Sequence, residues 1–215
     1  MAITKLSAFP AGAVPVAADT LGMVQSGVTN KVTASQLRTF VGAGLNNAAL
    51  AAVAGGYAAD TYLAGSSITI PTAGAWVAGS FYSCLFDMTK TAAGTAAFTV
   101  TVRMGTLGTT GDAAINTLTL AAGTAAIDNG WLEVLVAFRS VGAATSAVTV
   151  GSLKLSHALA ATGLASTGAS GIAIATTVSA GFNSTTQTII GLSVNGGASF
   201  SGTTQFVTAT LDKYQ

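Results

Sequence analysis

The sequence predicts a mainly β protein, in which a small N-terminal hairpin–helix segment precedes an antiparallel β-sandwich of the jelly-roll type. Residues 98–104 alternate between apolar and polar side chains, and residues 131–139 place an apolar side chain at every second position, as a strand with one buried face does. Turn signals also separate eight short strand candidates within residues 61–215. We divide the chain into an attachment segment (1–44), a link (45–60) and a β domain (61–215).

Residues 1–44 are predicted to form a hairpin followed by a short helix. The strand candidates LGMVQ and VTNKV flank Ser26-Gly27, a dipeptide that is common in turns. Thr33-Ala34-Ser35-Gln36 fits a capping box, which specifies the start of a helix. A short helix with one apolar stripe cannot bury itself, so we expect it to dock on another protein. The candidate attachment residues are Val24, Val32, Leu37, Phe40 and Val41.

Residues 45–60 are rich in alanine and glycine, and we interpret them as a link. Alanine favours helix, so the link can form a short helix that Asn46 or Asn47 caps and Gly55-Gly56 ends. Leu50 and Val53 would then lie on one side of that helix.

The β domain is read from its alternating strands. The inward residues of the two clearest strands are Phe98, Val100, Val102 and Met104, and Leu132, Val134, Val136 and Phe138. Glu133 and Arg139 are expected to face outward. The other strand candidates are SSITI, FYSCLFDM, INTLTL, AVTVGSLKL, TIIGLSV and QFVTATL. Residues 159–186 have a weaker pattern, which indicates long loops or an edge strand.

The composition indicates a subunit of an assembly. Only 7% of the 215 residues are charged, the net charge is +1, and no Asp, Glu, Lys or Arg occurs between Lys154 and Asp212. Soluble monomers usually carry a mixed charged surface and a larger net charge, so we expect much of this surface to face copies of the chain or another protein. The near-zero net charge gives no reason to expect nucleic acid or an anionic membrane as partner. We also expect no signal peptide and no membrane-spanning helix, since the longest apolar runs are too short.

Few residues in this chain could carry out chemistry. Asp87, Asp112, Asp128 and Glu133 are the candidates for the acid pair of a glycoside hydrolase. Asp112 and Asp128 lie in turn sequences, where aspartate usually bonds the backbone, and Glu133 is expected on the outer side of a strand. The structural interpretation of these acids is therefore favoured over a capsule-depolymerase activity, and no cofactor site is predicted.

The remaining candidates also have a structural interpretation. His157 has the same parity as Leu153 and Leu155 and is expected to be partly buried, while no metal-ligand spacing accompanies it. Cys84 is read as a small buried hydrophobe, although a Cys–His pair is the alternative. Trp76 and Trp131, with the tyrosines, would form a sugar platform only if they are exposed together.

The opening segment, LSAFPAGAVPVAADTLGMVQ followed by GVTNKVTASQLRTF, resembles a short module near the N-terminus of many tailed-bacteriophage virion proteins. The phrases AADTYLAGSSITIP, FDMTKTAAGTAAFTVTVRMGTLGTTGDAAI and DNGWLEVLVAFRSVGA are similar to phage fibre or head-decoration domains of jelly-roll type. The resemblance implies a homotrimer attached to a capsid or tail protein, and it marks no reactive residue.

Three functions follow as hypotheses. The favoured one is a capsid decoration protein or short head fibre of the virion, because residues 61–215 give little reach toward a cell. The alternative is a tail-fibre or tail-tip protein whose β domain binds a host receptor or glycan. An enzyme is the least favoured of the three, since the acids are few and lie mostly in turns.

Overall fold

The computed structural model describes residues 20–25, 28–33, 44–91, 93–166 and 171–213. The chain divides into two compact units, Met1–Ala43 and Gly44–Gln215. The regular elements of the described residues are all β-strands, which confirms the mainly β prediction. Within the same ranges there is no helix that could cross a membrane.

The first unit contains a β-hairpin at the position that the sequence predicts. β1 (Thr20–Gln25) pairs antiparallel with β2 (Val28–Thr33), and the register places Val24 opposite Thr29 and Val32 opposite Leu21. The predicted helix after β2, with Leu37, Phe40 and Val41, lies outside the described residues. The attachment role of this unit stays a prediction.

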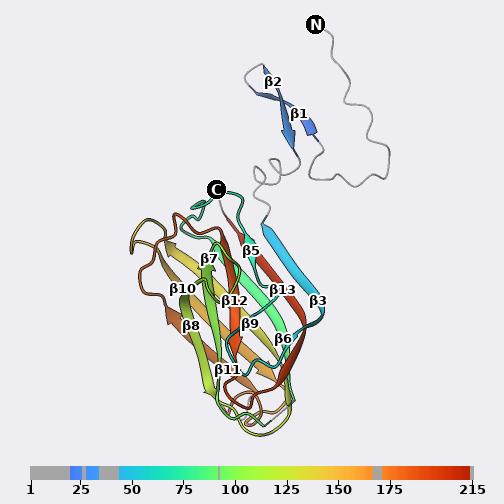
Figure 1. The fold of residues 1–215 in the computed structure, drawn as a ribbon. Coiled ribbons are helices and arrows are strands. Elements are labelled where there is room, and N and C mark those ends of the chain that lie inside the picture. Colours follow the sequence, from blue (N-terminus) through green and yellow to red (C-terminus); the bar gives the residue numbers. More distant parts are fainter. Residues whose placement is uncertain (1–19, 26–27, 34–43, 92, 167–170, 214–215) are drawn as a thin grey trace, which may run out of the picture. The chain divides into compact units, whose positions relative to one another are not determined.

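The second unit is built from two antiparallel sheets (Figure 1). One sheet has six strands in the order β11-β10-β9-β6-β13-β3, and the other has the order β4-β12-β7-β8, with β5 also paired to β12. The strands are β3 (Leu45–Gly55), β4 (Thr61–Tyr62), β5 (Ile68–Thr69), β6 (Phe81–Lys90), β7 (Ala97–Gly105), β8 (Ala113–Ala122), β9 (Asp128–Ser140), β10 (Val148–His157), β11 (Ile172–Val178), β12 (Ile189–Asn195) and β13 (Gly202–Asp212).

Alternate side chains of both sheets form one apolar core, as in a β-sandwich. The inward residues predicted for β7 and β9 are buried in this core, and Glu133 and Arg139 are exposed. Trp76 closes one part of it, because its ring stacks on Phe138 with centroids 5.1 Å apart and its Nε1–H donates to the Gln187 carbonyl at 2.9 Å.

The interpretation of residues 45–60 as a link with a short helix is wrong for Leu45–Gly55, which forms β3 at the edge of the six-stranded sheet. β3 pairs with β13, where Ala49 lies opposite Val207 and packs on the core. The backbone groups along that side of β13 need hydrogen-bond partners, and pairing with them outweighs the modest helix preference of alanine. The edge strand allowed within residues 159–186 is confirmed as β11.

Candidate functional site

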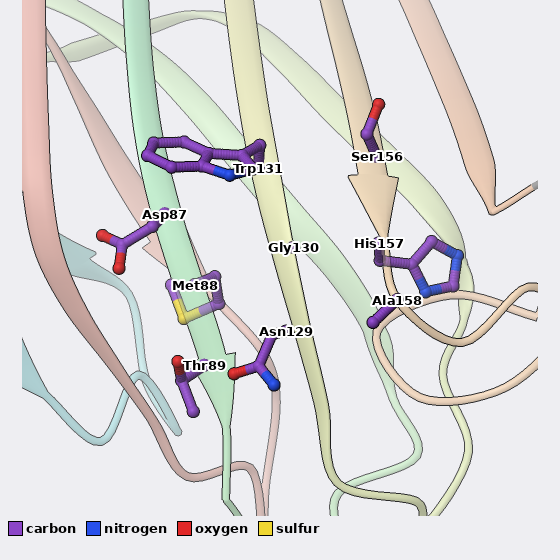
Figure 2. Close-up of a pocket in the computed structure, with 9 residues that line it drawn as sticks. All are labelled: Asp87, Met88, Thr89, Asn129, Gly130, Trp131, Ser156, His157 and Ala158. Atoms are coloured by element: carbon purple, nitrogen blue, oxygen red, sulfur yellow. The ribbon is translucent and has the colours of Figure 1, made fainter.

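A hollow of about 500 Å³ lies on the outer side of the six-stranded sheet, over β6, β9 and the end of β10. It is lined by Asp87, Met88, Thr89, Asn129, Gly130, Trp131, Ser156, His157 and Ala158. Figure 2 shows these residues on three neighbouring strands and the turn that follows β10.

Strand parity and register place the polar groups of the hollow beside Trp131. Asp87 is the partner of Trp131 on β6, and Ser156 is its partner on β10. Thr89 and Asn129 form the next outward pair along the sheet. Because its two register partners have short side chains, the indole of Trp131 stands above them and is 50% exposed. The result is a flat aromatic wall with hydroxyl, amide and carboxylate groups next to it.

A bulge in β13 completes this wall. The pairing of β13 with β6 is interrupted between Thr203 and Val207. The Asp87 carboxylate accepts hydrogen bonds from the backbone N–H groups of Gln205 (2.8 Å) and Phe206 (2.7 Å) in this bulge. Phe206 then contacts Trp131 edge to face, with centroids 5.7 Å apart. Asp87 therefore uses one carboxylate oxygen to hold the bulge.

His157 borders the hollow, but its ring points away from Trp131 (Figure 2). Its Nδ1 lies 2.6 Å from Oδ2 of Asp128, and both side chains are fully buried. Nε2 of His157 is also buried, and the described part of the chain gives it no hydrogen-bond partner. A carboxylate bound to an imidazole nitrogen is also the arrangement of a catalytic acid–base dyad. Here, however, neither side chain reaches the surface of the hollow.

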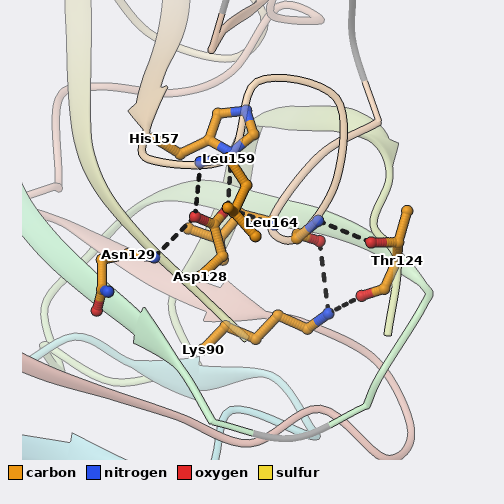
Figure 3. Close-up of polar contacts among 8 residues, drawn as sticks. Lys90, Thr124, Asp128, Asn129, His157, Leu159 and Leu164 are labelled. Atoms are coloured by element: carbon orange, nitrogen blue, oxygen red, sulfur yellow. Dashed lines mark hydrogen bonds and ion pairs between the residues drawn. The ribbon is translucent and has the colours of Figure 1, made fainter. Parts of the chain in front are cut away.

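Asp128 is the centre of a buried polar cluster (Figure 3). Besides Nδ1 of His157, its carboxylate accepts the backbone N–H groups of Asn129 (2.9 Å), Leu159 (3.2 Å) and Leu164 (2.9 Å). These bonds tie the loop after β10 to the start of β9. The sequence missed the pairing with His157, because the two residues lie 29 positions apart and no local pattern connects them.

Lys90 belongs to the same cluster. Its ammonium donates to the Thr124 carbonyl and, at 3.4 Å, to the Gly163 carbonyl. Burial lowers the pKa of Lys90, and the Asp128 carboxylate acts in the opposite direction. The cluster thus holds the loops at one end of the sandwich together through hydrogen bonds among backbone groups, the Lys90 amine and the Asp128 carboxylate. Its role is structural.

The other predicted acids are distributed over the domain. Asp112 binds the turn before it, where its two oxygens accept the backbone N–H groups of residues 106–109. Asp87 and Glu133 share the outer side of the six-stranded sheet at diagonal positions of β6 and β9. Among the described residues, no group of three or more His, Cys, Asp or Glu side chains could hold a metal ion.

The two tryptophans do not form the sugar platform that the sequence suggested. Trp76 is only 2% exposed and lies in the core, so Trp131 is exposed without it. Cys84 is buried on β6, and burial raises the pKa of its thiol to about 12, as expected for a small apolar core residue. Its side chain points into the core rather than toward the hollow.

The outer face of the six-stranded sheet, defined as the outward side chains of its strands, is unusually apolar. Antiparallel sheets normally place polar side chains on the face that meets water. Here exposed large apolar side chains occur on β3, β6, β9 and β11, and they are Leu50, Phe81, Leu85, Trp131, Ile172, Ile174 and Val178. The hollow is the polar end of this face.

Comparison with known proteins gives no assignment, since no protein-family model and no curated relative matches this sequence.

Proposed function

We propose that this chain is a non-enzymatic structural protein of a bacteriophage virion, as a capsid decoration protein or short head fibre. Its hairpin–helix segment docks on a capsid protein, and its β domain, a sandwich of jelly-roll type, forms a homotrimeric knob. The observation that carries the proposal is the group of seven large apolar side chains exposed on the outer face, because exposed apolar side chains gathered on one surface commonly mark a site of protein contact.

The reactive groups support a structural role. The acids with backbone partners hold a bulge (Asp87), a turn (Asp112) and the buried cluster (Asp128). The only imidazole of the chain, His157, is buried in that cluster. These groups are used to fix the fold, and this leaves the surface to make contacts rather than to catalyse a reaction.

Electron microscopy of particles from the phage that encodes the chain tests this function. A gold-labelled antibody against the β domain should decorate the heads, and heads without label would refute the proposal. A chain that lacks residues 1–44 should remain a folded oligomer and lose binding to particles. Retained binding by this truncated chain would refute the attachment role of the segment.

A host glycan is the ligand of a second candidate function, which the hollow favours. The apolar face of a sugar ring stacks on an exposed indole such as Trp131, and its hydroxyls can bond Asn129 and Ser156. Calorimetric titration with host surface glycans should then show an affinity loss of about tenfold or more for Trp131→Ala. Leu107→Ala, an exposed position in the β7–β8 loop, is the control and should bind as wild type. Equal affinities for both variants would exclude this site.

A further inference from the structure

The apolar side chains of the outer face are neighbours in space. In one row across the sheet, Ile172 pairs with Ser156, which pairs with Trp131. Phe206 stands against Trp131 on one side and pairs with Leu50 on the other. The next row places Ile174 beside Lys154. Exposed apolar groups therefore occur from the β11 edge to the β3 edge, with Ser156 between Ile172 and Trp131.

The size of the outer face matches one side of a protein–protein interface. Six strands about 4.8 Å apart and four outward rows about 6.8 Å apart cover about 800 Å². Stable interfaces bury about 800 Å² on each partner, so the face is large enough for one complete contact.

The charges on the outer face are few and of both signs. Lys154 and Glu133 are register partners near its centre. The ion pairs among the described residues are Arg103–Asp60 and Asp128–His157, so Lys154 and Glu133 are free to pair with another molecule. A second copy carries the same two groups, and Lys154 of one copy can meet Glu133 of the other. The outer face has no excess of positive charge that would attract a strongly charged partner such as nucleic acid.

We infer that, in the assembled protein, the outer face of the six-stranded sheet is covered by a second copy of this chain. The inference rests on the proposed function, in which the β domain is oligomeric, and adds the surface that makes the contact. It also separates the two candidate functions, because a copy seated on the outer face would cover Trp131.

Light scattering coupled to size exclusion tests the contact on the full-length chain. The wild type should have a mass well above the 21.0 kDa of one chain, and the proposed homotrimer should have about three times that mass. Ile174→Lys and Leu50→Lys place a charge on the outer face at positions 66% and 71% exposed, where the fold itself is little affected. Each should reduce the mass to 21.0 kDa at micromolar concentration.

The chain offers matched controls for both variants. Ile127→Lys and Leu107→Lys make the same changes at positions 65% and 64% exposed, in loops outside the six-stranded sheet. Both should retain the wild-type mass. Circular dichroism should show native strand content in all four variants, so that loss of assembly is separated from unfolding.

Trp131 provides a second measurement, because Trp76, the other of the two tryptophans, is buried in the core. Acrylamide should quench the wild-type fluorescence weakly and that of Ile174→Lys several-fold more strongly, and Trp131→Phe should remove this difference. A monomeric wild type would overturn the inference. So would an oligomer that keeps its mass in both outer-face variants and in which Trp131 is freely quenched. Either result would leave the proposed function open, because that function is tested by antibody labelling of the particles.

Discussion

Replacing Asp128 by Asn tests whether the buried cluster holds the sandwich closed. The change preserves the size of the side chain but replaces one carboxylate oxygen with an NH₂ group. Each oxygen of Asp128 accepts two N–H groups, from His157 and Leu164 at Oδ2 and from Asn129 and Leu159 at Oδ1. Either orientation of the amide therefore leaves two donors facing another donor.

The expected loss in unfolding free energy follows from those two donors. A buried donor without an acceptor costs about 1–3 kcal/mol and the donors of Asn129 and Leu159 are partly buried, so Asp128→Asn should cost about 2–4 kcal/mol. A change of tautomer at His157 would not recover this loss. The proton would move to Nε2, which is buried and has no partner among the described residues. The Leu164 N–H would still lack an acceptor.

Urea unfolding at neutral pH and one fixed protein concentration measures the effect, since assembly contributes to apparent stability. Asp60→Asn is the matched control, because Asp60 forms a surface ion pair with Arg103 and should lose about 1 kcal/mol or less. If Asp128→Asn and Asp60→Asn destabilise the protein equally, the cluster does not hold the fold together in the way inferred here.

Two further predictions use the same unfolding measurement. Burial raises the pKa of Cys84 from 9.0 to about 12, so the unfolded chain releases this proton first and stability falls as pH rises from 9 toward 12, by about 1.4 kcal/mol per unit. Cys84→Ala should remove this part of the alkaline decline, and an unchanged slope would contradict the assignment. Trp76→Ala should cost about 3–5 kcal/mol, because the ring is buried and stacked on Phe138; a loss below about 1 kcal/mol would contradict this packing.

The central strands could be predicted because their signal is local. Alternation alone identified the buried face of β7 and β9, and it requires no knowledge of the neighbouring strands. β3 was missed for the opposite reason. Its alanines favour helix when considered locally, and only the unpaired side of β13, more than a hundred residues later, makes it a strand.

The candidate site was partly visible in the sequence. The sequence left the exposure of Trp131 open, although Trp131 has the same parity as Glu133 and lies with it on the outer side of β9. No comparable pattern in the sequence indicates that Trp76 is buried. It lies outside any strand, and its ring packs on Phe138. The cluster around Asp128 depends on contacts between segments that are distant in the sequence. Neither composition nor residue spacing indicates such contacts.

The geometry around Asp87 bears on whether the outer face is an accident of composition. A regular β13 would alternate its side chains and would not place Gln205 and Phe206 on the same side of the sheet. The bulge does so, and Asp87 stabilises it by accepting both of its free N–H groups. One of the few charged side chains on this face is thus used to hold Phe206 outward against Trp131. An aromatic ring held on the outer face by a specific carboxylate, next to the exposed Trp131, is unfavourable in a lone domain and becomes favourable when another surface covers both rings.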